Sequence, residues 1–63
     1  MTRCEMEVLR VVKVRGFVYE LRWICDVMRR RGYSENEVRV ALKNLVKRGV
    51  LRQGSKDHEF EME

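Results

Sequence analysis

The chain has 63 residues, of which 44% are hydrophobic and 38% are charged, and its formal net charge is +4. A chain of this length forms one small domain that buries only about 60% of the surface it exposes when unfolded. Residues 1–48 contain 12 Lys and Arg against 6 Asp and Glu, whereas residues 49–63 contain 2 against 4. A basic body on so small a chain favours an anionic partner, nucleic acid first, over ordinary solubilising charge.

No apolar run approaches the length of a membrane span, and no signal peptide is present, so we expect a cytoplasmic protein. The two cysteines, Cys4 and Cys25, fit neither a disulfide framework nor a metal-binding spacing. Buried free thiols are the default expectation, and a disulfide within the chain or between two chains stays open as an alternative.

The first predicted element is a helix over about residues 3–15. Thr2 and Glu5 have the spacing of a capping box, and Gly16 is a plausible residue to end the helix. The residues at helical spacing on one apolar face are Cys4, Val8, Val11 and Val12. The β-prone run 17–19 follows, which is too short for an independent strand but able to add one pairing to a sheet.

The second predicted helix covers about residues 20–31 and ends at Gly32. Its apolar face consists of Leu21, Ile24, Cys25 and Met28. Its last turn carries three consecutive arginines, which the helix dipole favours at that end.

The third predicted helix, over about residues 35–48, has the clearest boundaries. Ser34 and Glu37 form a second capping box, and Gly49 provides the stop. The apolar stripe that we expect in the core is Val38, Ala41, Leu42 and Leu45.

The remaining residues, about 50–62, predict a β-hairpin. Its second arm alternates His58, Phe60 and Met62 with Glu59, Glu61 and Glu63. We expect Phe60 and Met62 to cover the helices and the glutamates to face water. The whole chain, 1–63, is thus predicted to be one α+β, mainly helical domain: a helix-turn-helix with a short strand before it and a hairpin wing after it.

The face of the third helix opposite its apolar stripe contains no acidic residue. Its members are Asn36, Arg39, Val40, Lys43, Asn44 and Lys47. Arg and Lys donate to guanine, Asn pairs with adenine and a valine contacts a thymine methyl, so this face suits a major groove. The alternative is a plain basic, solvated surface.

The segment "ELRWICDVMRRRGYSENEVRVALKNLVKRGVLRQG" resembles the winged helix-turn-helix superfamily, and in size the chain is similar to small stand-alone archaeal or archaeal-virus regulators. The residues that match the superfamily pattern are Gly32, Tyr33, Ser34, Val38, Leu42, Leu45, Gly49, Val50 and Leu51. The chain departs from the pattern at Tyr19–Glu20, at Arg31 and in its acidic second wing arm. The resemblance implies sequence-specific binding of double-stranded DNA and transcriptional regulation. Because the second wing arm is acidic and leaves only Arg52 and Lys56 to meet phosphate, we expect the recognition helix to dominate over the wing.

The predicted site follows from these faces. The predicted base contacts are Asn36, Arg39, Val40, Lys43 and Asn44. The predicted phosphate contacts are Arg29, Arg30, Arg31, Ser34, Lys47, Arg52 and Lys56. The predicted homodimer interface, from apolar residues left over once the core is assigned, consists of Val14, Trp23 and Val27.

Catalysis finds no support in the sequence, so we expect no enzyme, cofactor, metal site or small-molecule substrate. The single histidine, His58, has no partner at a recognisable spacing, and the four glycines form no phosphate-binding loop. The alternative function is a protein-binding adaptor of the same fold, which would use the Trp23 flank or the acidic residues Glu59, Glu61 and Glu63.

Overall fold

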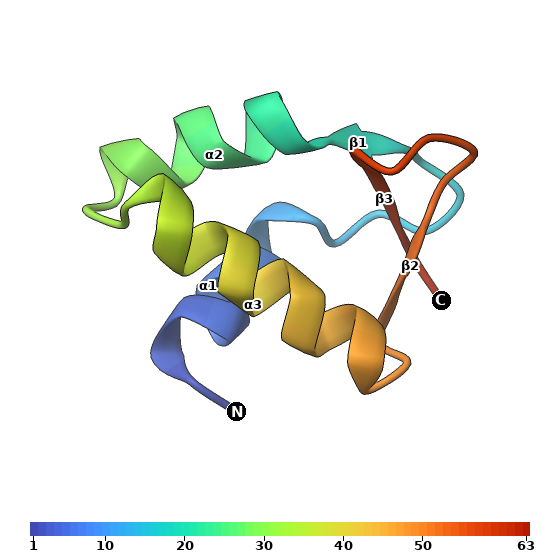
Figure 1. The fold of residues 1–63 in the computed structure, drawn as a ribbon, viewed down its shortest axis with the longest axis horizontal. Helices are drawn as coiled ribbons and strands as arrows, with labels where there is room; N and C mark the ends of the chain where they lie inside the picture. Colours follow the sequence, from blue (N-terminus) through green and yellow to red (C-terminus); the bar gives the residue numbers. More distant parts are fainter.

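Three helices and a three-stranded antiparallel sheet make up the fold, and the computed structural model describes all of residues 1–63 (Figure 1). In chain order the elements are α1 (Arg3–Val11), β1 (Tyr19–Glu20), α2 (Leu21–Arg30), α3 (Glu35–Lys47), β2 (Leu51–Gln53) and β3 (Glu59–Met62). This small α+β arrangement is compatible with a winged helix, and its elements follow the predicted order.

Both predicted capping boxes are present. The hydroxyls of Thr2 and Ser34 accept the backbone N–H groups of Glu5 and Glu37, and the two carboxylates accept the N–H groups of the capping residues in return. These bonds satisfy N–H groups that a helix start otherwise leaves unpaired. The backbone hydrogen bond from Ser34 is the main reason why the pKa of the Glu37 carboxyl lies below its ordinary value.

Gly32 and Gly49 end α2 and α3 in the same way. Both have positive φ, at 93° and 77°, and each is followed by a residue whose N–H bonds back to the helix. The N–H of Tyr33 donates to Met28 at 3.1 Å and that of Val50 donates to Leu45 at 3.0 Å. With the bonds made by the glycine N–H groups themselves, these are Schellman motifs. They fix the direction in which the chain leaves each helix.

The first helix is shorter than predicted, because it ends at Val11 and not near residue 15. Val12 already leaves the helical region, with φ −103° and ψ 71°, although its side chain is fully buried. The branched valines of this segment favour helix weakly, and burying Val12 in the core outweighs continuing the helix. Gly16, with φ 76°, therefore lies in the connection to β1 and does not cap α1.

The sheet has the order β1-β3-β2, so the last strand of the chain lies in its centre. Tyr19 pairs with Phe60 and Glu20 pairs with Glu59, while Leu51 pairs with Met62 across the hairpin. The predicted edge pairing from the run after Gly16 is therefore present. Phe60 is buried as expected, whereas Met62 is half-buried.

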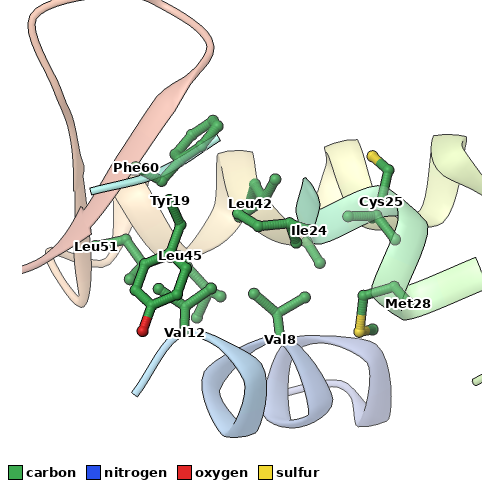
Figure 2. Packing of buried hydrophobic residues seen from close by; sticks show 12 residues of the cluster. Val8, Val12, Tyr19, Ile24, Cys25, Met28, Leu42, Leu45, Leu51 and Phe60 are labelled. Atoms are coloured by element: carbon green, nitrogen blue, oxygen red, sulfur yellow. The ribbon is translucent and has the colours of Figure 1, made fainter. Parts of the chain in front are cut away.

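The core joins all three helices to the sheet, and Figure 2 shows its side chains converging between them. Both cysteines are free, and Cys25 belongs to this core, where burial raises the pKa of its thiol. The other buried hydrophobic residues are Val8, Val12, Tyr19, Ile24, Met28, Val38, Ala41, Leu42, Leu45, Leu51 and Phe60.

The two faces of α3 should differ sharply in their tolerance to truncation. Leu45 is 0% exposed and Val40 is 57% exposed on the same helix. We expect Leu45→Ala to lower the free energy of unfolding by about 2–5 kcal/mol, because it leaves a cavity. We expect Val40→Ala to change it by no more than about 0.5 kcal/mol, since its side chain has few contacts and alanine favours helix. Urea unfolding of both variants tests this, and similar losses would contradict the assignment of the two faces.

Candidate nucleic-acid interface

One face of α3 is held against the rest of the protein and the opposite face is open. Val38, Ala41, Leu42 and Leu45 are buried in the core. At about 100° per residue, the side chains furthest from this stripe project away from the protein. Those that the structure leaves exposed are Asn36, Val40, Lys43 and Lys47, which we call the α3 ridge.

The ridge lies between α1, which packs on one flank of α3, and the hairpin, which lies on the other flank. On one flank, α1 supplies the Cys4 thiol, whose Sγ lies 3.6 Å from the carbonyl oxygen of Glu37 and donates to it. On the other flank, a groove of about 350 Å³ separates α3 from the hairpin, with Leu42 and Phe60 in its lining. Neither neighbour covers the ridge residues.

Asn44 belongs to the α1 flank and not to the ridge. Its Nδ2 donates to Oε2 of Glu5 at 3.1 Å, and its side chain is half-buried. Glu5 of α1 is itself 1% exposed, so this bond from α3 satisfies a buried carboxylate. The predicted base contact of Asn44 is therefore replaced by a structural one, because α1 packs on that side of α3.

Arg39 lies at the edge of the ridge that faces α2 and the hairpin. Its Nε donates to Oε2 of Glu35 at 2.9 Å, and both side chains are more than half exposed. Glu35 does not belong to the predicted basic face, but its ion pair with Arg39 places a carboxylate beside one edge of that face. Residues four apart on a helix lie on the same side, so the sequence spacing already allowed the pair.

The three arginines at the end of α2 have different surroundings. Arg29 pairs with Asp26 at 3.3 Å in the same helix. Arg31 pairs with Glu7 of α1 at 3.3 Å, so its guanidinium is directed toward α1. Arg30 is exposed and has no ion-pair partner. Of the three predicted phosphate contacts, Arg30 is thus the one with a free charge.

The hairpin offers little free positive charge. Arg52 pairs across the strands with Glu61 at 3.2 Å and approaches Glu63 at 3.9 Å. The hydrogen bond from its side chain to Glu61 is the main reason why the pKa of Arg52 is raised. Lys56, at the hairpin turn, is exposed and has no ion pair. Lys56 is thus the hairpin cation without an ion pair, whereas Arg52 is engaged by two glutamates.

A polar cleft of about 570 Å³ lies between α2, the first half of α3 and the hairpin turn. Arg22, Arg29 and Arg39 all line it, which places three guanidinium groups beside the α3 ridge. Arg22 was missing from the predicted site. Its spacing of seven residues from Arg29 puts both on one side of α2, and that spacing is the signal that would have found it.

Exposed apolar side chains gather near β1 and the first turn of α2. Those that we call the aromatic patch are Val14, Phe17, Val18 and Trp23, each between 44% and 55% exposed. The ring of Tyr19 contacts those of Phe17 and Trp23, with centroid distances of 4.9 and 5.4 Å. Of the three residues predicted for a dimer interface, Val14 and Trp23 are exposed and Val27 is only partly exposed. Phe17 and Val18 are exposed as well, but the sequence pattern assigned them to strand pairing.

Comparison of the chain with protein-family models, with curated proteins and with solved structures finds no match. None of its helices has the length and apolar character that crossing a membrane requires.

The Asn44–Glu5 bond predicts a difference between two asparagines on the same helix. The side-chain bond from Asn44 is the main reason why the pKa of Glu5 lies below its ordinary value of 4.5, and burial opposes it. Because the pKa of Glu5 is lower in the folded state than in the unfolded state, its ionised carboxylate stabilises the protein at pH values above 4.5. This stabilisation is lost as the pH falls from 4.5 through the lower pKa of the folded state. We expect Asn44→Ala to raise the pKa of Glu5 and to weaken the acid dependence of stability.

Asn36→Ala is the matched control, since Asn36 is exposed and has no such bond. An NMR titration of the glutamate carboxyl carbons, with urea unfolding across the acid range, measures both effects. An unchanged Glu5 pKa in Asn44→Ala would show that the bond does not control the titration.

Proposed function

We propose that this protein binds double-stranded DNA sequence-specifically as a winged helix-turn-helix protein, places α3 in the major groove and acts in transcriptional regulation. The observation that carries the proposal is the α3 ridge, whose amide and ammonium groups stand free on a helix anchored by its opposite face. The exposed face of a helix that binds no partner more often contains both acidic and basic residues, which pair with each other.

The dimensions of α3 suit this role. Its 13 residues span about 20 Å at 1.5 Å per residue. The B-DNA major groove is about 12 Å wide and admits one helix. Asn36, Val40, Lys43 and Lys47 are three or four residues apart, so they form one row that faces the groove along its length.

Base contacts are assigned to Asn36, Val40 and Lys43. Arg39 joins them by leaving its ion pair with Glu35 and binding a guanine base. Arg39 is held by Glu35 in an exposed ion pair, and such pairs contribute only about 0.2–1 kcal/mol. A bidentate contact with guanine contributes about 1–3 kcal/mol of discrimination. The contact of Arg39 with guanine is therefore favoured over its ion pair with Glu35. The negative charge of Glu35 adds selectivity, because it repels a phosphate group that would approach Arg39.

Phosphate contacts are assigned to cations around the ridge that have no strong internal partner. These are Arg22, Arg30 and Lys56, together with Lys47 at the end of the ridge and the hydroxyl and free N–H groups at the Ser34 end of α3. Arg29 is also assigned to phosphate, because its ion pair with Asp26 is exposed and easily broken. Arg31 and Arg52 are not assigned, because carboxylates of α1 and β3 bind them.

A homodimer is part of the proposal, and the aromatic patch supports it. Tryptophan and phenylalanine are enriched where proteins bind one another, and Phe17, Val18 and Trp23 line one shallow pocket beside β1. The same patch also supports the second candidate function, a protein-binding adaptor. The acidic strand supports that candidate less, because Glu61 and Glu63 face Arg52.

The division between base and phosphate contacts is tested with three variants. We expect Lys43→Ala to weaken binding to a selected sequence by about 1–3 kcal/mol while hardly changing binding to random duplex. We expect Arg30→Ala to weaken both alike and to reduce the slope of log affinity against log salt by about 0.9. Lys13→Ala, an equal charge loss on the connection after α1, is the control and should leave both affinities close to wild type.

Fluorescence anisotropy, with a duplex selected from a random pool and with random duplex of the same length, gives the affinities. Equal losses for both duplexes in Lys43→Ala would refute the base contact. Absence of binding to any duplex at low salt would refute DNA binding and favour the adaptor.

The dimer is tested separately by sedimentation equilibrium. We expect wild type to associate at tens of micromolar and Trp23→Ala to shift toward monomer, because truncating an interface tryptophan commonly costs 2 kcal/mol or more. Met6→Ala, which removes another exposed apolar side chain outside the patch, is the control and should still associate. A monomeric wild type at that concentration would contradict the dimer.

A further inference from the structure

The structure brings the carboxylate of Glu20 together with the imidazole and carboxylate of two consecutive residues, His58 and Glu59, far along the chain. Glu20 lies at the end of β1, Glu59 begins β3 and His58 precedes it. One ligand atom from each lies within 4.8 Å of the others. The backbone fixes this grouping, because Glu20 pairs with Glu59 in the sheet and the N–H of Leu21 donates to the carbonyl of His58 at 2.8 Å.

The two carboxylates carry negative charge that no Lys or Arg of the chain compensates. Like charges directly opposite each other on paired strands are destabilising. Neither Glu20 nor Glu59 has an ion pair, although the chain has exposed cations to spare. The acidic residues that are paired with arginine elsewhere in the structure are Glu7, Asp26, Glu35, Glu61 and Glu63.

The hydrogen bonds around Glu59 leave part of its carboxylate free. Its Oε1 accepts the Ser55 hydroxyl at 3.1 Å and the Lys56 N–H at 3.3 Å, which holds the side chain over the hairpin turn. Its Oε2 accepts no hydrogen bond. Gly54 makes this position possible, since a Cβ there would lie 2.9 Å from that of Glu59. One of the three side chains is thus positioned in advance by the turn.

We propose that Glu20, His58 and Glu59 bind a divalent transition-metal ion, with zinc as the preferred ion. Zinc binds imidazole nitrogen and carboxylate oxygen at about 2.0–2.2 Å, which puts neighbouring ligand atoms roughly 3.4 Å apart in a tetrahedron. The three ligand atoms now lie within 4.8 Å of one another. Because Glu20 and His58 are exposed, their side chains can rotate and shorten these distances to those of a zinc site. The imidazole selects zinc over magnesium and calcium, which prefer all-oxygen sites. The fourth position is left to water.

Such an ion ties the hairpin turn to the start of α2. Crosslinking by a metal is one way in which domains of this size gain stability. Glu20 and His58 also line the cleft that contains Arg22 and Arg39. If the proposed DNA binding is correct, neutralising the two carboxylates removes a repulsion toward phosphate beside these arginines, so zinc raises affinity for DNA.

Titration calorimetry of the untagged chain with zinc chloride, without DNA, tests the site directly. We expect one zinc ion per chain and a higher unfolding temperature with zinc than without it. We expect His58→Ala and Glu20→Gln each to weaken zinc binding at least about tenfold, since each removes a ligand. Glu61→Gln, the same change two residues along β3 from Glu59, is the matched control and should bind as wild type does. Magnesium chloride should give no saturable binding.

The proposal is overturned if wild type shows no saturable zinc binding, or if both ligand variants bind zinc as tightly as wild type. Circular dichroism of each variant verifies that it is folded, and the two substituted side chains are exposed. Because the titration contains no DNA, its result is independent of the proposed DNA binding.

Discussion

Burial of the apolar stripe of α3 determines which of its side chains are presented outward. Through this stripe α3 contacts α1, α2 and β2. Moving the helix by one residue in either direction would rotate it by about 100° and would bring Lys43 of the ridge, or Glu37 and Asn44, toward the core. Burying an unpaired charge costs several kcal/mol, so the apolar stripe and the polar ridge enforce the same orientation. The composition of the ridge therefore follows from the packing on the far side of the same helix.

The charged residues divide into those that hold the fold together and those that remain available. Arg31 ties α2 to α1 through Glu7, and Arg52 joins the two hairpin strands through Glu61. Lys43 and Arg30 have no such partners. Net charge alone does not distinguish the two groups. The distinction matters because only an unpaired cation can release counterions from DNA without first giving up an internal contact.

Features set by short stretches of sequence were predicted well. The boxes at Thr2 and Ser34 and the Schellman turns at Gly32 and Gly49 depend on residues within one helical turn of each other, and all four are present. Helix α1 was predicted too long, since its end depends on where the core needs Val12.

Features that depend on packing between distant elements were not predictable in the same way. Asn44 and Asn36 both lie on the polar side of α3, and only the position of α1 shows that Asn44 faces Glu5. The group formed by Glu20, His58 and Glu59 depends on the pairing of the first strand with the last. Glu59 follows His58 in the sequence, whereas Glu20 reaches it only through the sheet register, so sequence spacing could not show the complete group.

Unpaired acids and unpaired bases lie on neighbouring parts of the surface around α3 and the hairpin. If the proposed DNA binding is correct, Arg22 and Lys43 attract phosphate, whereas Glu20 and Glu59 repel it, and this contrast orients the approaching DNA. In the proposed complex the hairpin approaches the DNA backbone less closely than α3 approaches the bases, unless a cation first occupies the group formed by Glu20, His58 and Glu59. Electrostatic repulsion of this kind acts mainly on orientation and on the rate of association, so under this proposal the surrounding charges support recognition by α3 and do not replace it.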